Sequence, residues 1–138
     1  MEYCENKLTY KEYVSLRSSV GWNNFFEEQT KRSIENSLYT ITIKEKKDTI
    51  GMGRLIGDGM YFLIVDVVVK PEHQNKGIGS QIIDLLCEYV EKVTPVDGRS
   101  SIQLIAEVGK EGFYIKKGFK LIPNEFCGSG MRKIIRNK

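Results

Sequence analysis

The chain is poor in the residues that bind metals or form disulfide bonds. Its 138 residues include three cysteines, Cys4, Cys87 and Cys127, and a single histidine, His73. The cysteines are odd in number and irregularly spaced, so they fit neither a disulfide framework nor a zinc-binding motif. We therefore expect reduced thiols, no metal site and a cytoplasmic protein.

Long hydrophobic runs and a strong charge of one sign are also missing. No stretch approaches the roughly 18 apolar residues of a membrane-spanning helix, and the first residues lack the apolar region of a signal peptide. The formal net charge is +3, and the basic residues are scattered except near the C-terminus. We therefore expect no membrane association, and no nucleic-acid partner, since such a partner requires a basic face.

The remaining composition is that of an ordinary globular protein. Hydrophobic residues make up 41% and charged residues 28% of the chain, which contains no repeat and no low-complexity linker. A chain of 138 residues can bury one sizeable core. We expect residues 1–138 to form a single domain.

The most informative stretch runs from Tyr61 to Val93. Residues 61–69 are mostly β-branched and aromatic and end just before Pro71, which predicts a buried strand. Apolar residues later recur at intervals of three and four up to Val93, as on one face of a helix. A polar turn, residues 74–80, joins the strand to this helix.

This turn predicts an anion-binding site. The unpaired amide groups and the partial positive charge at the start of a helix favour a phosphate. Gly77 and Gly79 remove side chains that would keep a phosphate oxygen away, and Lys76 adds a positive charge. The patterns G-x-x-x-x-G-K-[ST] and G-x-G-x-x-G are both absent, so neither a P-loop nor a dinucleotide-binding fold is indicated.

The rest of the chain predicts an α/β fold with a mixed sheet. Thr9 and Glu12 match a capping box at the start of a helix, and Asp58-Gly59 marks a tight hairpin. The strand-helix-strand order of residues 61–106 implies a parallel crossover. Strands are predicted at residues 2–8, 38–44, 49–56, 61–69, 101–106, 119–122 and 131–135, and helices at residues 10–18, 27–37, 78–93 and 107–117.

Four glycines in the predicted meander, at positions 51, 53, 57 and 59, do not indicate a second phosphate site. A turn and a strand follow them, so no helix N-terminus faces a ligand there. Close packing or a bulge explains strand glycines better.

Two motifs on these elements resemble the GNAT superfamily of N-acetyltransferases. Gln74-x-x-Gly77-x-Gly79, after a strand that ends in Val-x-Pro, is similar to the acetyl-CoA pyrophosphate loop of that family. Residues 113–119, Phe-Tyr-Ile-Lys-Lys-Gly-Phe, are similar to its Phe-Tyr-x-Lys-x-Gly-Phe segment. The order of elements resembles GNAT along almost the whole chain. Residues 51–59 and 128–131, together with Asp66, resemble small bacterial members whose substrates are mostly unassigned.

The resemblance implies the GNAT fold, a mixed sheet of about seven strands with four helices, and acetyl-CoA as co-substrate. Strands four and five would splay apart and free backbone groups that bind the pantetheine arm. The amide groups of residues 75–80 would hold the pyrophosphate. The residues that the resemblance implies in co-substrate binding are Val67, Val68, Val69, Gln74, Asn75, Lys76, Gly77, Ile78, Gly79, Ser80, Phe113 and Lys117.

Transfer of an acetyl group to an amine requires two proton movements. An alkylammonium with a pKa of about 10.4 is more than about 99.9% charged at pH 7, so a base must remove its proton. The candidates are Glu107 and Asp66, although Asp66 could equally be a structural hydrogen-bond acceptor. The resemblance implies that Tyr114 protonates the leaving thiolate, and the alternative for this residue is a core tyrosine. Residues 106–112 lack the asparagine that many relatives carry before this helix, which leaves a CoA contact unassigned.

The acceptor is expected to be a primary amine on a small molecule, a peptide or a protein. The aromatic residues of segment 22–26 either line a pocket or fill the core. Arg54 and Asp58 suit an acceptor with both a carboxylate and an amine, or they pair with each other at the hairpin end. The predicted substrate-binding residues are Trp22, Phe25, Arg54, Asp58 and Tyr61.

These observations predict an acetyl-CoA-dependent N-acetyltransferase that works by direct attack of the amine, with a general base and a general acid. The alternative is an acyl-CoA-binding module without catalysis, which acts as a sensor or as a partner subunit. The resemblance also implies a homodimer, by analogy alone.

Overall fold

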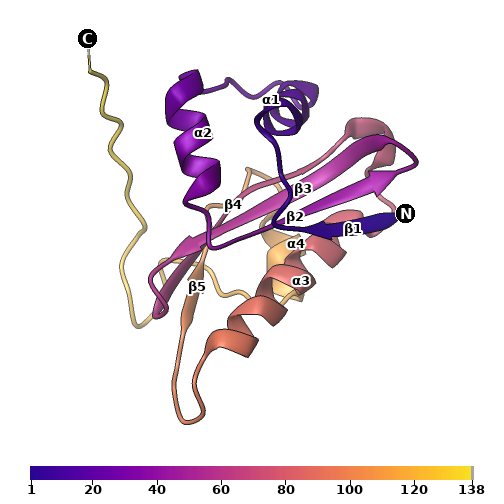
Figure 1. The fold of residues 1–138 in the computed structure, drawn as a ribbon. Coiled ribbons are helices and arrows are strands. Elements are labelled where there is room, and N and C mark those ends of the chain that lie inside the picture. Colours follow the sequence, from indigo (N-terminus) through magenta and orange to yellow (C-terminus); the bar gives the residue numbers. More distant parts are fainter. Residues whose placement is uncertain (138) are drawn as a thin grey trace. The chain divides into compact units, whose positions relative to one another are not determined.

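The computed structural model describes residues 1–137, in two compact units, Met1–Ile105 and Ala106–Lys138, which we treat separately. The first unit contains a sheet and its covering helices, and the second contains one short helix (Figure 1). The elements are β1 (Glu2–Glu5), α1 (Tyr10–Ser19), α2 (Glu27–Glu35), β2 (Tyr39–Glu45), β3 (Asp48–Gly57), β4 (Tyr61–Val69), η1 (Pro71–His73), α3 (Ile78–Val93), β5 (Ser101–Gln103) and α4 (Glu111–Lys116).

The sheet of the first unit has the strand order β1-β2-β3-β4-β5. The pairs from β1 to β4 are antiparallel, and β4 pairs with β5 in parallel through the crossover helix α3. The predicted meander and the predicted parallel crossover are therefore confirmed.

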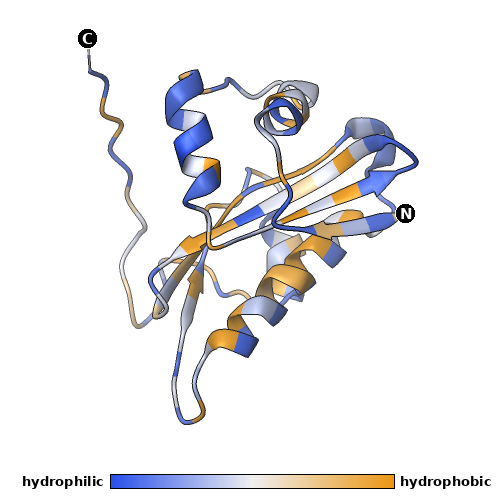
Figure 2. Cartoon of the chain, in the orientation of Figure 1, coloured by the Kyte–Doolittle hydropathy of each residue, from blue (hydrophilic) through white to orange (hydrophobic). Residues whose placement is uncertain are grey.

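Helices cover both faces of this sheet. Met52 of β3 packs with Tyr13 and Leu16 of α1, whereas the neighbouring Gly53 faces Ile82 of α3. Successive residues of a strand point to opposite faces, so α1 and α3 lie on opposite sides of β3, as Figure 1 shows. Figure 2 shows α3 as largely hydrophobic and α2 as largely hydrophilic, which agrees with five buried residues in α3 and one in α2.

Strand β4 is irregular in its second half. Met52 pairs with Val68, but Arg54 pairs with Val65, so two residues of β4 stand opposite one residue of β3. This β-bulge contains Asp66, whose φ of 56° is unusual for a residue with a side chain. On its other edge β4 pairs with β5 only from Tyr61 to Leu63. The expected splay between the fourth and fifth strands is therefore present.

The sheet has five strands among the described residues, and the prediction of seven was wrong. Residues 119–122 and 131–135 form no strand, and the second unit contains only an isolated bridge between Asn124 and Cys127. The apolar side chains of the second segment are largely exposed, at 95% for Met131 and 77% for Ile135. The β-forming preference of such residues depends on a neighbouring strand to pack against, which a pattern of residue types does not reveal.

Gly53 shows why strand glycines are needed under α3. A Cβ atom at this position would lie 2.6 Å from Cγ2 of Ile82 and 3.1 Å from Cδ1 of Leu86. This close approach supports the packing interpretation at Gly53, whereas Gly59 lies in the β3–β4 turn with nothing within 4 Å of its Cβ position.

We expect Gly53→Ala to lower the free energy of unfolding by about 1–3 kcal/mol, because the added methyl group displaces α3 side chains. Urea denaturation of the purified protein measures the change. Gly51→Ala is the matched control, because its Cβ would approach no described atom closer than 3.3 Å. An equal loss in the two variants would mean that contact with Ile82 does not limit this position.

Candidate functional site

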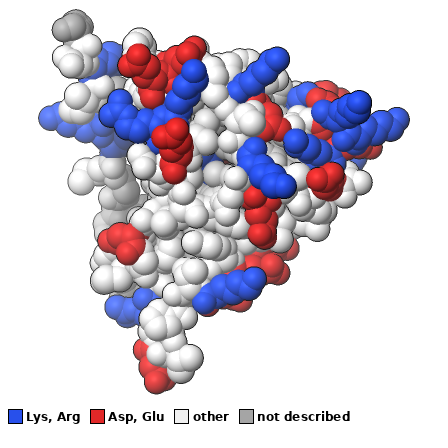
Figure 3. All heavy atoms as spheres, viewed as in Figure 1, with Lys and Arg blue, Asp and Glu red and all other residues white. Residues whose placement is uncertain are grey.

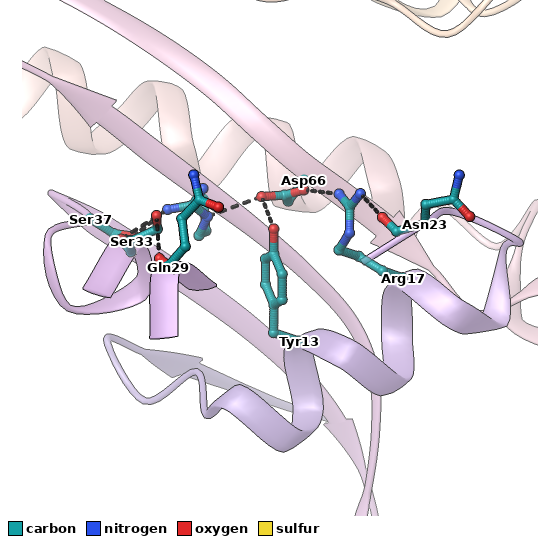
Figure 4. Close-up of polar contacts among 8 residues, drawn as sticks. Tyr13, Arg17, Asn23, Gln29, Ser33, Ser37 and Asp66 are labelled. Carbon is teal, nitrogen blue, oxygen red and sulfur yellow. Dashed lines mark hydrogen bonds and ion pairs between the residues drawn. The ribbon is translucent and has the colours of Figure 1, made fainter. Parts of the chain in front are cut away.

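A polar cluster is buried between α1 and the β4 bulge (Figure 4). We call Tyr13, Arg17, Arg54 and Asp66 the Asp66 cluster. Oδ1 of Asp66 accepts a hydrogen bond from Nη1 of Arg17 at 2.6 Å, and Oδ2 accepts from Nε of Arg54 at 3.0 Å and from the Tyr13 hydroxyl at 2.9 Å. The Asp66 side chain is 8% exposed. Both carboxylate oxygens therefore have donors, as a buried charge requires.

Local structure explains how these side chains meet. Tyr13 and Arg17 are four residues apart on α1 and point the same way. The helix begins with the predicted capping box, in which Thr9 and Glu12 satisfy each other's backbone amides. Arg54 lies on β3 beside the bulge that carries Asp66.

Arg54 also connects the cluster to α2. Its Nη1 donates to the carbonyl oxygen of Ser33 at 3.1 Å and to the hydroxyl of Ser37 at 2.9 Å. Arg54 is 8% exposed, so its guanidinium is committed to these contacts and to Asp66. The cluster therefore joins α1, α2, β3 and β4.

Tyr13 is held in its neutral form. Burial, followed by the charge of Asp66 and the hydrogen bond to it, raises the pKa of Tyr13 to about 12. Its hydroxyl therefore remains a donor to Asp66 throughout the physiological pH range.

We expect Tyr13→Phe to flatten the alkaline loss of stability. An unfolded tyrosine ionises near pH 10, whereas folded Tyr13 has a pKa of about 12. Between these values the unfolded state releases a proton that the folded state keeps, so the stability falls as the pH rises. Urea denaturation at a series of pH values from 9 to 12 measures the slope. Identical slopes for the variant and the wild type would contradict this.

The loop between α1 and α2 forms a pocket of about 480 Å³, lined by Arg17 and residues 21–25. Nη2 of Arg17 donates to the carbonyl oxygen of Asn23 at 2.6 Å. The guanidinium carbon lies 5.2 Å from the ring centroids of both Trp22 and Phe25. Two of the predicted substrate-binding residues, Trp22 and Phe25, are thus brought together around one cation.

The other three predicted substrate-binding residues have different surroundings. Arg54 pairs with Asp66, so the expected alternative of an Arg54–Asp58 pair is wrong. Oδ1 of Asp58 instead accepts hydrogen bonds from the amides of Met60 and Tyr61, both at 2.9 Å, and these amides lower the pKa of Asp58. Tyr61 is 60% exposed. Asp58 therefore stabilises the β3–β4 turn, and Arg54 and Asp58 do not form a joint site for a carboxylate and an amine.

The glycine turn before α3 has the features of an anion cradle. Gly77 is the N-cap of α3 with a φ of 82°, and a Cβ atom there would meet nothing within 4 Å. Nε2 of Gln74 donates to the carbonyl oxygen of Val69 at 2.9 Å and so fixes the turn to the end of β4. The first turn of α3 has no acidic residue. Open space, unpaired helix amides and the positive end of the helix dipole all suit a diphosphate.

The second unit contains the other sequence motif. The ring of Tyr114 stands edge-on to the rings of Phe113 and Phe119, with centroid distances of 5.0 and 5.9 Å. Burial, and then the negative charge of Glu107, raises the pKa of Tyr114. Tyr114 is therefore protonated at neutral pH, as a general acid must be. Helix α4 is shorter than predicted, because residues 107–110 form a turn with Gly109 at a φ of 91°.

Neither the distribution of surface charge nor the arrangement of potential metal ligands indicates a further site in the described part of the chain. Acidic and basic side chains are interspersed over the face drawn in Figure 3. Within residues 1–137, no three potential metal-binding side chains of the His, Cys, Asp or Glu type come together. No helix in the same range is long and apolar enough to cross a membrane.

Sequence reasoning missed Tyr13 and Arg17. Their spacing of four residues within one predicted helix was available as a signal. That spacing does not reveal a partner more than 40 residues away, so their link to Asp66 required the fold.

The comparisons with known proteins agree with the strand, turn and helix described above. A family model described as an acetyltransferase (GNAT) domain matches residues 3–134. The chain therefore belongs to the GNAT family of N-acetyltransferases, which use acetyl-CoA as co-substrate.

Particular relatives come from algae, plants and bacteria. The chain is 33% identical over 122 residues to the uncharacterized N-acetyltransferase ycf52 of Pyropia yezoensis, covering 85% of this chain and 68% of the relative. It is 30% identical to the chloroplastic serotonin N-acetyltransferase 2 of Oryza sativa, covering 79% of this chain and 55% of the relative. A crystal structure of a probable acetyltransferase of unknown function from meticillin-resistant Staphylococcus aureus superposes with a TM-score of 0.86, at 30% identity and 98% coverage of both chains.

Proposed function

We propose that this protein transfers the acetyl group of acetyl-CoA to a primary amine by direct attack of the amine on the thioester. The observation that carries this proposal is that an unpaired strand edge leads along the chain to an open glycine turn. The edge of β4 is free of β5 from Ile64 onward, and the same strand leads to the open glycine turn at the head of α3. Backbone donors and acceptors are thus followed directly by an anion cradle.

The donor would lie along this path. The backbone of Val67, Val68 and Val69 would pair with the amide groups of the pantetheine arm. The amides of residues 75–80 would bind the diphosphate, with Lys76 as an added positive charge. The side chain of Gln74 would act indirectly, since it already holds the turn to Val69.

The chemistry exchanges one bond for another. The nitrogen lone pair of the neutral amine attacks the thioester carbonyl, a nitrogen–carbon bond forms and the carbon–sulfur bond breaks. The nitrogen releases its second proton in this step, which balances the proton that the leaving thiolate gains. We assign Tyr114 as the acid that gives its proton to the leaving thiolate, a role for which its phenol carries the required proton at neutral pH. We assign Glu107 as the base that takes the ammonium proton, because both oxygens of Asp66 are occupied by donors.

The acceptor would enter the pocket at residues 21–25. Trp22 and Phe25 offer aromatic surface, which suits an amine attached to an apolar or aromatic group. The relative named serotonin N-acetyltransferase makes arylalkylamines a sensible first class to test. Peptide N-terminal and lysine amines form the second class.

Two measurements test the proposal. Calorimetry with acetyl-CoA should detect binding, and a free-thiol assay with a panel of arylalkylamines, polyamines and peptides should detect CoA release. Tyr114→Phe should retain acetyl-CoA binding while kcat falls by about 10²-fold or more, because the thiolate leaves without its acid. A protein that binds acetyl-CoA and acetylates no amine would be an acyl-CoA-binding module instead. A protein that binds no acetyl-CoA would refute the proposal.

A further inference from the structure

Arg17 contacts two different parts of the first unit, the β4 bulge and the α1–α2 loop, with one side chain. Its Nη1 donates to Asp66 on the β4 bulge, and its Nη2 donates to the carbonyl oxygen of Asn23 in the α1–α2 loop, both at 2.6 Å. Its flat face lies near Trp22 and Phe25. The side chain is 11% exposed, so these contacts are largely shielded from water. Arg17 therefore connects the strand that would bind the donor to the loop that would bind the acceptor.

The loop has one other described contact with the core, because the half-buried Trp22 packs against the cluster that contains Tyr13, Met52 and Val68. Gly21, Asn23, Asn24 and Phe25 are all exposed. The remaining described hydrogen bonds of the loop run to the adjacent end of α1, such as that from Nδ2 of Asn24 to the Ser18 hydroxyl at 3.0 Å. Besides this apolar contact of Trp22, the pair of hydrogen bonds from Arg17 to Asp66 and to Asn23 is the described polar link between this segment and the sheet.

We propose that Arg17 is a positioning residue that holds the acceptor loop, residues 21–25, in register with the β4 bulge. A guanidinium can donate to two acceptors in fixed directions while its faces stack on aromatic rings, and a lysine ammonium cannot do both. The assignment of the loop to the acceptor rests on the proposed function. The structural claim that Arg17 orders the loop is independent of the proposed function.

Arg54 provides an internal comparison. It donates to the other oxygen of the same carboxylate and is equally buried, but its further contacts go to Ser33 and Ser37 at the α2 end. A change at Arg54 therefore disturbs the Asp66 cluster without removing the link to residues 21–25.

Trp22 makes the test direct, because it is the only tryptophan of the chain. Acrylamide quenching of its fluorescence should be measured for the wild type, Arg17→Lys, Arg17→Gln and Arg54→Lys. Arg17→Gln introduces no unpaired buried ammonium, so it replaces Arg17→Lys in the measurement if that variant fails to fold. We expect the quenching constant to rise about twofold or more in the Arg17 variants, because the loop loses its link to the sheet, and to stay near the wild-type value in Arg54→Lys.

Measurements of the Kd for acetyl-CoA and of the KM for the amine distinguish a positioning role of Arg17 from a general loss of structure. In the Arg17 variants the Kd for acetyl-CoA should stay within about twofold of the wild type, while the KM for the most active amine of the panel rises about tenfold. Unchanged quenching in both Arg17 variants, or an equal rise in Arg54→Lys, would overturn the proposal. Absence of acetyl-CoA binding by the wild type would refute the proposed function alone, because the quenching comparison needs no ligand.

Discussion

Replacement of Asp66 by alanine is expected to lower the free energy of unfolding by about 3–5 kcal/mol. The substitution leaves the guanidinium groups of Arg17 and Arg54, with side chains 11% and 10% exposed, without their shared counter-charge. It also removes the acceptor of the Tyr13 hydroxyl. Urea denaturation followed by circular dichroism measures the loss, and a cost below about 1 kcal/mol would show that the cluster is not a structural centre.

Two further variants at this position separate charge from backbone conformation. Asp66→Asn keeps the shape and one acceptor oxygen, so its loss should be smaller than that of alanine. Asp66→Gly removes the side chain but accommodates the φ of 56° without strain. We expect Asp66→Gly to be more stable than Asp66→Ala by about 1 kcal/mol. The reverse order would mean that the bulge relaxes once the carboxylate is gone.

Replacement of Gly77 by valine is expected to raise the Kd for acetyl-CoA about 30-fold, which corresponds to about 2 kcal/mol, because the valine side chain occupies the open space in front of the helix amides. The diphosphate would meet the amides in this same space. A β-branched residue is also strained at the φ of 82° that Gly77 adopts at the start of α3, so the variant should lose stability as well. Isothermal calorimetry measures the affinity.

Gly59→Val is the matched control for Gly77→Val. Gly59 also has a positive φ, of 100°, and open space around it, but it lies in the β3–β4 turn. The two variants should lose similar stability, and only Gly77→Val should lose affinity for acetyl-CoA. Equal affinity losses would show that strain anywhere in the sheet unit weakens binding.

The parts of the fold that depend on residues adjacent in the sequence could be predicted from the sequence alone. The change from a β-branched run to an amphipathic helix defines β4 and α3, and Gly77 marks the turn between them. These signals are local, because each residue's backbone preference is expressed within one turn or strand. The two closing strands were predicted on the same grounds and are not formed among the described residues, because a strand also requires a partner.

The candidate site was predictable only in part for a related reason. The glycine turn at residues 74–80 is local and was predicted, whereas the Asp66 cluster joins residues 13, 17, 54 and 66 across three elements. A carboxylate on a strand has the same appearance in a sequence whether it faces a substrate or two arginines. Its interpretation as a candidate base or as a structural acceptor therefore remained open until its partners were known.

The net charge of the Asp66 cluster affects the protonation of an amine bound in the adjacent pocket. Two guanidinium groups surround one carboxylate while Tyr13 keeps its proton, so the cluster has one positive charge in excess. Arg17 presents this excess to the pocket beside Trp22. An ammonium ion that enters is repelled and its pKa falls, whereas the uncharged amine is not repelled. If this pocket holds the acceptor, as we propose, it favours the uncharged, reactive form of the amine before any base acts, and weakly basic amines should be the best substrates at neutral pH.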